Sequence, residues 1–211
     1  MRSRWKLSYR DRFRDLKKNL LLIIFNCKED KDIVLTGGPW LFDKSILLLK
    51  KLKKEISAEE AEFCADSLWI RVFGVPYLRF SKEVGEVIGN SIGKFEDGEL
   101  INGKGNNGTY MRLRIKIDVR NPLKRGMNLS YGTDGKAWLQ FRYERLPNFY
   151  FVCDTMGHVD EECKQENHDQ DMGKEVSLQY GHWLRVESER MGRERVSGGL
   201  RGWVGKGLVV A

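Results

Sequence analysis

Two segments of this 211-residue chain alternate between aliphatic side chains and polar or aromatic ones, and this alternation constrains the fold more than any other feature. The segments are residues 68–75, LWIRVFGV, and residues 111–120, MRLRIKIDVR. Successive side chains of a β-strand point to opposite faces, so each segment predicts a strand with one aliphatic face. A sheet built from such strands buries one face against a core and leaves the other accessible.

The accessible face of these two strands is predicted to carry two aromatic rings and four cations: Trp69, Arg71, Phe73, Arg112, Arg114 and Lys116. Aromatic rings are stacking platforms for unpaired bases, worth about 1–3 kcal/mol per base, and cations follow the phosphates. The face is therefore predicted to bind single-stranded nucleic acid, either RNA or DNA. The alternative is an ordinary solvated face on which a loop or a further strand covers Trp69 and Phe73.

Apolar runs and helical periodicity predict the remaining elements. Further strands are expected at 19–25, 45–52 and 137–145, and helices at 28–36 and 81–95. Ser81 is expected to cap the second helix, and residues 97–109, rich in Gly and Asn, to form a loop. The order β-α-β-β-α-β with an extra strand favours an α+β fold with a ferredoxin-like, RRM-like sheet and helices on one face.

Three glycines recur every four residues along the second predicted helix, at Gly85, Gly89 and Gly93. Glycine costs an isolated helix about 1 kcal/mol relative to alanine, so a repeated glycine needs a structural reason. A strip without side chains lets a helix approach its neighbour closely. We expect these residues to pack against the sheet rather than to bind a ligand.

The charge balance and the cysteines limit the classes of protein. Lys and Arg total 37 against 30 Asp and Glu, a formal net charge of +7, and eight of the cations lie in residues 1–18. The longest fully apolar run, 20–25, is far shorter than the roughly 20 residues of a membrane span. No secretory signal is visible, so the four cysteines are expected to be thiols or metal ligands. The expected location is the nucleus or the cytoplasm, without secretion.

Two common catalytic motifs, H-E-x-x-H and the P-loop, are absent from the sequence. A formal G-x-S-x-G occurs at 89–93, GNSIG, but it lies within a predicted helix and not at the strand-to-helix turn that the motif requires. A formal G-x-G-x-x-G at 103–108 follows a predicted loop and precedes a strand, which is the wrong context for a dinucleotide site. The chain is therefore predicted not to be an enzyme.

Three candidate metal ligands lie in the stretch LPNFYFVCDTMGHVDEEC. Cys153, His158 and Cys163 have the spacing C-x4-H-x4-C, which is three quarters of the zinc knuckle C-x2-C-x4-H-x4-C. Thiolates and imidazole suit tetrahedral zinc. Tyr150 occupies the first-ligand position, so zinc binding is predicted to be weak or lost. His168 is a candidate replacement ligand, the alternative being a solvated residue of an acidic tail.

Several separated stretches resemble a plant domain-of-unknown-function family that precedes a CCHC-type zinc knuckle in LINE-type retrotransposon proteins. The stretches are GGPWLFDKSILLLKKL (37–52), LWIRVFGVPYLRFSKEVGEVIGNSIGKF (68–95), MRLRIKIDVRNPLKRG (111–126), FRYERLPNFYFVCDTMGHVDEEC (141–163) and QYGHWLRV (179–186). The resemblance implies nucleic-acid and zinc binding in an accessory part of a retrotransposon-derived protein. The sequence departs from the family at Tyr150, in a short start before residue 19, and in an acidic knuckle.

These observations together predict four regions and a function. The regions are a basic arm (1–18), a ferredoxin-like α+β domain (19–147), a degenerate zinc knuckle (148–168) and a partly disordered extension (169–211). The predicted function is a non-enzymatic module that binds nucleic acid, with no membrane partner. The alternative is a vestigial or protein-interaction domain that keeps the fold but binds neither zinc nor nucleic acid well.

Overall fold

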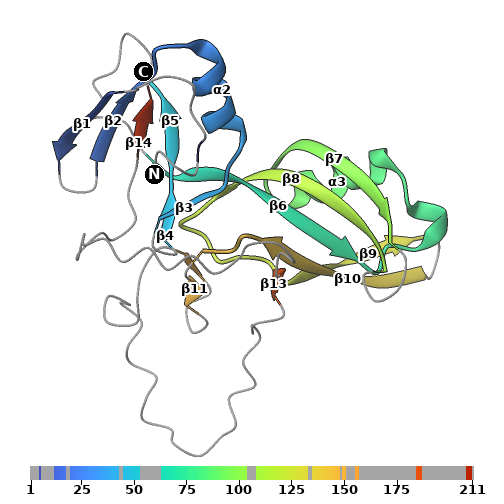
Figure 1. Ribbon diagram of the computed structural model, residues 1–211. Helices are drawn as coiled ribbons and strands as arrows, with labels where there is room; N and C mark the ends of the chain where they lie inside the picture. The colour runs from blue at the N-terminus through green and yellow to red at the C-terminus, as the bar shows by residue number, and fades with distance from the viewer. Residues whose placement is uncertain are drawn as a thin grey trace, which may run out of the picture. The chain divides into compact units, whose positions relative to one another are not determined.

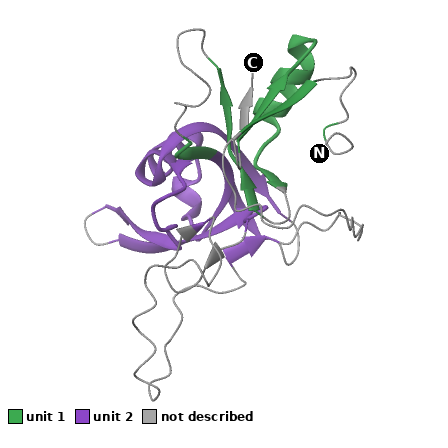
Figure 2. Ribbon diagram, turned by 90° about the vertical axis from the view of Figure 1, so that its left-hand side faces the viewer, with its two compact units in different colours: residues 1–66, 192–211 green, residues 67–191 purple. Residues whose placement is uncertain are grey.

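The computed structural model describes residues 5, 12–17, 20–42, 45–52, 63–103, 108–132, 135–147, 149–150, 155–156, 184–186 and 208–210 (Figure 1). The chain divides into two compact units (Figure 2). The first unit comprises residues 1–66 and 192–211, and the second comprises residues 67–191. No helix in these described ranges has the length and apolar character needed to cross a membrane.

The first unit contains a four-stranded sheet in the order β1-β2-β14-β5. Its strands are β1 (Arg12–Lys17), β2 (Leu20–Ile24), β14 (Leu208–Val210) and β5 (Leu49–Lys51). β14 pairs in parallel with both β2 and β5. The unit also contains helix α2 (Lys28–Thr36) and a two-stranded pairing of β3 (Trp40–Phe42) with β4 (Ser45–Leu47).

A small apolar cluster forms the core of the first unit: Trp5, Leu21, Ile23, Val34 and Leu47. The Trp5 ring contacts those of Phe13 and Trp40, with centroids 6.4 and 5.8 Å away. The indole of Trp40 donates a 2.6 Å hydrogen bond to the carbonyl of Val34 in α2. Aromatic packing therefore links α2 and β3 to the strand pair β1–β2.

The second unit is built on a six-stranded sheet in the order β13-β10-β6-β8-β7, with β9 also paired to β10. The strands are β6 (Ala65–Phe73), β7 (Lys94–Asn102), β8 (Thr109–Asp118), β9 (Gly126–Tyr131), β10 (Gly135–Glu144) and β13 (Arg185–Val186). Helix α3 (Lys82–Ile92) packs against β7 and β8, and a 3-10 turn, η2 (Tyr77–Arg79), precedes it (Figure 1). A short hairpin joins β11 (Phe149–Tyr150) and β12 (Thr155–Met156).

The alternation of the two central strands is confirmed. Leu68, Ile70 and Val72 of β6 are buried, as are the aliphatic residues of β8 from Met111 to Ile117. The core also receives Leu139, Phe141 and Tyr143 from β10. The core lies on the side of the sheet that α3 covers, because the Gly85 backbone packs on Leu113 and Met111.

Helix α3 begins and packs as its sequence predicts. The Ser81 hydroxyl accepts a 3.4 Å hydrogen bond from the N–H of Val84, which is the geometry of an N-cap. A Cβ added at Gly85 would lie 3.2 Å from Leu113, and one at Gly89 would lie 2.6 Å from the Phe95 ring. Gly85 and Gly89 therefore allow the predicted close contact between helix and sheet. The predicted end of the helix at residue 95 is wrong, since α3 ends at Ile92, Gly93 follows it, and residues 94–95 begin β7.

The prediction of one sheet covered by both helices is wrong. β2 and β5 belong to the sheet of the first unit, whereas β6 and β8 belong to that of the second. An apolar run identifies a strand by its local pattern but carries no information about its partner. The fold is mixed, with mostly strands, the helices α2 and α3 in separate units, and an antiparallel central sheet.

Three local predictions also need correction. Residues 12–17 of the expected basic arm form β1, since Phe13 packs onto the apolar cluster of the first unit. The expected strand 45–52 is divided between β4 and β5, which belong to different sheets. The expected loop 97–109 begins with most of β7, whose polar sequence suits a strand at the edge of a sheet.

Candidate nucleic-acid interface

All six residues predicted to bind nucleic acid lie on one face of the sheet in the second unit. β6 supplies Trp69, Arg71 and Phe73, and the adjacent β8 supplies Arg112, Arg114 and Lys116. Each alternates with a buried aliphatic neighbour, so the six side chains lie opposite the face that α3 covers. We call this surface the ring-and-cation face. The role of the six residues in binding stays a prediction.

Rings and guanidinium groups stack on one another across this face. The guanidinium carbon of Arg112 lies 3.8 Å from the centroid of the Trp69 ring, and that of Arg114 lies 5.8 Å from it. Arg71 lies over the ring of Tyr110 at 4.8 Å, and the rings of Tyr110 and Phe73 are 5.2 Å apart. Cation–π contacts of this kind hold the side chains in place.

Three carboxylates pair with the arginines of the face. Glu144 at the end of β10 accepts hydrogen bonds from Arg71 at 2.7 Å and from Arg112 at 3.0 Å. From the edge strand β7, Glu99 lies 3.3 Å from Arg112 and Glu96 lies 3.2 Å from Arg114. Much of the positive charge predicted from β6 and β8 is therefore balanced by neighbouring strands.

Glu144 is the most buried carboxylate of this network, with 16% of its side chain exposed. Burial alone would raise its pKa, but hydrogen bonds from Arg112 and Arg71, together with their charges, lower the pKa of Glu144 below its ordinary value. Burial likewise opposes the charge of Arg112, and the bonds to Glu144 and Glu99 still raise the pKa of Arg112. Both shifts favour the charged forms of Glu144 and Arg112.

Sequence reasoning missed four residues of this face: Tyr110, Trp138, Arg142 and Glu144. Tyr110 was missed because β8 begins at Thr109, before the predicted start of that strand. The other three belong to β10, where they alternate with the buried residues Leu139, Phe141 and Tyr143. In the sequence of β10, apolar residues alternate with polar or aromatic ones, as they do in β6 and β8. This pattern could have assigned Trp138, Arg142 and Glu144 to the accessible face of the sheet.

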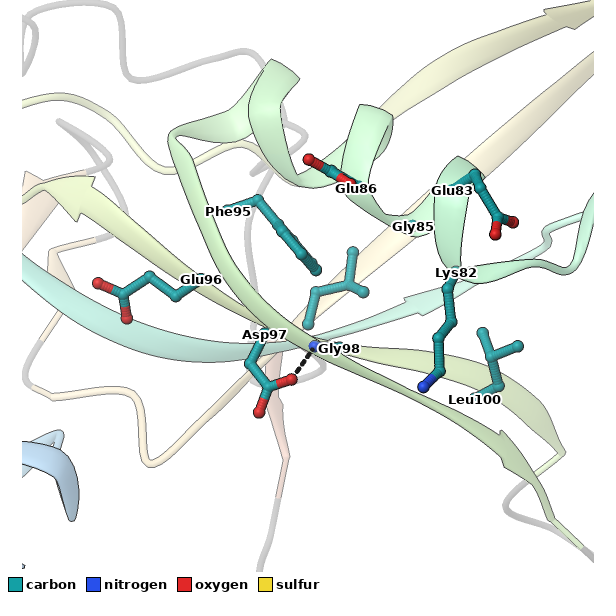
Figure 3. A pocket seen from close by; sticks show the side chains of 10 residues that line it. Lys82, Glu83, Gly85, Glu86, Phe95, Glu96, Asp97, Gly98 and Leu100 are labelled. Carbon is teal, nitrogen blue, oxygen red and sulfur yellow. Dashed lines mark hydrogen bonds between the residues drawn. The ribbon is translucent and has the colours of Figure 1, made fainter.

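A separate hollow lies between the start of α3 and the edge strand β7 (Figure 3). Its apolar lining comes from Phe95, Leu100 and Leu113. Its charged lining comprises one cation and four carboxylates: Lys82, Glu83, Glu86, Glu96 and Asp97. Figure 3 shows the Asp97 carboxylate accepting the N–H of Gly98 at 2.8 Å. A lining with this charge repels phosphate, so the hollow does not extend the candidate interface.

The three predicted zinc ligands, Cys153, His158 and Cys163, lie outside the described residues. Tyr150 is described as backbone: it ends β11 and pairs with Thr155 of β12. In the sequence, Tyr150 stands three residues before Cys153, at the position of the first ligand of a knuckle, and the role of the three ligands in binding zinc stays a prediction. Within the described ranges, no three His, Cys, Asp or Glu residues form a group that could hold a metal.

Comparison with protein families gives two matches. Residues 1–60 match a domain of unknown function, DUF4283, and residues 117–165 match the zinc knuckle family. The knuckle match begins near the end of β8 and includes β9, β10 and the β11–β12 hairpin. The chain therefore resembles a DUF4283 domain followed by a CCHC-type zinc knuckle, which confirms this part of the predicted resemblance.

Comparison with whole proteins adds one relative, an uncharacterized protein of Arabidopsis thaliana. It is 23% identical over 130 residues, which are 62% of this chain and 41% of the relative. The chain thus spans about two fifths of the length of this curated relative. No solved structure matches the chain.

Proposed function

We propose that this protein is a non-enzymatic module that binds single-stranded nucleic acid on the ring-and-cation face. The observation that carries the proposal is the interleaving of rings and guanidinium groups on one sheet face, with Arg112 3.8 Å from the Trp69 ring. Rings stack with bases of any sequence, and guanidinium groups hold phosphates. The ligand class is RNA or single-stranded DNA.

The zinc knuckle match supports the same class of ligand, because zinc knuckles are among the modules that bind single-stranded RNA. The formal net charge of +7 favours association with a polyanion. We propose that the sheet is RRM-like only in its use of two faces: α3 covers one face, and the other carries the rings and cations. We further propose a plant retrotransposon origin, nuclear or cytoplasmic location and a degenerate, weakly zinc-binding knuckle.

The full chain can be tested with fluorescent oligouridylate, oligodeoxythymidylate and a duplex of equal length, by anisotropy over a series of salt concentrations. Either single strand is expected to bind more tightly than the duplex, since duplex bases cannot stack on the sheet. Affinity is expected to fall steeply as salt increases. An absence of binding to both single strands at low salt would contradict the proposal.

One observation favours the second candidate, a protein-interaction or vestigial domain. Arg71, Arg112 and Arg114 already have carboxylate partners, so their charge is not fully available to phosphates. Such a domain would keep its thermal stability but bind neither single strand. Metal analysis of the purified protein together with the same titration separates the two candidates.

A further inference from the structure

We infer that the ligand is held at the β9–β10 end of the ring-and-cation face, where a base stacks on Trp138 and a phosphate binds Arg142. We call these two residues, with Arg125 and Lys136, the Trp138 subsite. The inference rests on the proposed function and places its principal contacts outside the residues that the sequence predicted.

The register of the sheet places the Arg142 end of this subsite beside β6 and the Trp138 end beside β9. Gln140 of β10 pairs with Phe73, and Arg142 pairs with Arg71. Trp138 and Lys136 are separated from Arg142 by even numbers of residues along β10, so all three side chains lie on the same face of the sheet. Arg142 is four residues from Trp138, roughly 13 Å along the strand, so the subsite suits an oligonucleotide rather than a mononucleotide.

The indole of Trp138 is supported on one side and accessible. A Cβ added at Gly126 would lie 2.6 Å from Cζ2 and 2.8 Å from Cε2 of Trp138, so the bare backbone of β9 packs against the ring. The residue is nevertheless 50% exposed. The guanidinium of Arg125 lies 5.8 Å from the ring, farther than the 3.8 Å that separates Arg112 from Trp69. A base can therefore stack on Trp138 with less displacement than on Trp69.

Arg142 has hydrogen-bonding capacity that its surroundings do not meet. Its guanidinium lies 4.8 Å from the Phe73 ring, and its Nε is buried and has no hydrogen-bond partner among the residues that the structure describes. Its Nη2 reaches Gln140 at 3.5 Å, the long limit for a hydrogen bond. A buried donor without an acceptor is costly, so a small movement of this side chain toward a phosphate oxygen is favoured.

The charge balance also differs between the two ends of the face. Arg71, Arg112 and Arg114 each pair with a carboxylate. No salt bridge to Arg125, Lys136 or Arg142 is found among the residues that the structure describes. Among the described residues, phosphates at the β9–β10 end therefore meet no salt-bridged carboxylate that competes for these three cations.

The test uses the full chain and the labelled oligouridylate and oligodeoxythymidylate, so that its two arms distinguish RNA from DNA. Trp138→Leu is expected to weaken binding about five- to a hundredfold through the lost stacking. Arg142→Gln is expected to lower the slope of log affinity against log salt by about 0.7, the value of one phosphate contact on a single strand. Trp138→Phe keeps an aromatic ring and should retain most of the affinity. Arg142→Lys keeps a positive charge and should retain most of the slope of log affinity against log salt.

Two control variants are available, and unfolding curves confirm that each protein folds. Tyr77→Leu removes an aromatic ring that is 89% exposed outside the sheet, and it should leave binding unchanged. Arg114→Gln removes a cation of the same face that pairs with Glu96. If Arg114→Gln weakens binding whereas Trp138→Leu and Arg142→Gln do not, the subsite is wrong and the proposed function stands. If the unmodified chain binds neither strand, both fail.

Discussion

The guanidinium of Arg112 lies over the ring of Trp69 at 3.8 Å, and the same guanidinium donates to Glu144 at 3.0 Å. The ring that sequence reasoning assigns to a base is therefore covered by a cation of the same chain. A base that stacks on Trp69 must first displace Arg112, and a phosphate that binds Arg112 must compete with Glu144.

The triple change of Arg71, Arg112 and Arg114 to Ala should weaken binding of single strands and flatten its salt dependence. Each full phosphate contact contributes about 0.7 to the slope of log affinity against log salt. Since all three arginines have carboxylate partners, we expect a reduction smaller than three such contacts would give. The measurement is anisotropy over a salt series. An unchanged slope would remove these three arginines from the binding site.

Glu144→Gln should increase the affinity for single strands several-fold. The change removes the charge that holds Arg71 and Arg112 and leaves both guanidinium groups for phosphate. Glu86→Gln, a change of the same kind in the acidic hollow, is the matched control and should have little effect. Equal increases in both variants would indicate a general effect of net charge instead of a local one.

The stability that Glu144 contributes should depend on pH. The pKa of Glu144 is lower in the folded protein than the ordinary value of 4.5, so the unfolded chain takes up the proton first. Its contribution is present above pH 4.5 and is lost as the pH falls through the folded pKa. Urea unfolding of the unmodified protein and of Glu144→Gln should therefore differ most near neutral pH and converge under acid conditions. If the difference in the free energy of unfolding between the two proteins grows toward low pH, the pKa of Glu144 is not lowered by folding.

Two glycines of α3, Gly85 and Gly89, should respond differently to replacement by alanine. At Gly89 a Cβ would lie 2.6 Å from the Phe95 ring and 3.1 Å from the Cβ of Phe95, which cannot move without its backbone. Gly89→Ala is therefore expected to destabilise the protein by roughly 1–3 kcal/mol. At Gly85 the nearest atom, 3.2 Å away, is the end of the Leu113 side chain, and helix propensity favours alanine by about 1 kcal/mol. Urea unfolding should show Gly85→Ala to be neutral or slightly stabilising, and equal losses would contradict the packing.

Tyr150→Cys should raise the affinity for zinc markedly, because it completes the C-x2-C-x4-H-x4-C spacing with Cys153, His158 and Cys163. Competition with a chromophoric chelator measures the affinity, and Tyr150→Phe is the control. Affinity should fall at low pH, since thiolates must lose their protons to bind. If the unmodified protein already binds zinc as tightly as Tyr150→Cys, the knuckle is not degenerate, and His168→Ala would test the replacement ligand.

Local features of the second unit were predictable because they depend on neighbours in the sequence. The alternation of β6 and β8 assigned Trp69 and Arg112 to one face, and Ser81 marked the start of α3. The partners of these residues were not predictable, since they come from distant parts of the chain. Glu144 is 73 residues from Arg71, and no local pattern indicates that β10 lies beside β6. The charge of the face was therefore overestimated from the strands alone.

β14 lies between β2 and β5, although more than 150 residues separate it from either strand in the sequence. The second unit is thus an insertion within the first, since the chain leaves the sheet of the first unit and returns to it at 208–210. During synthesis, β2 and β5 are made long before β14, and within the described part of the chain no other strand pairs with the edges that face it. A protein shortened before residue 208 would keep those edges open, which is the condition under which strands recruit other chains.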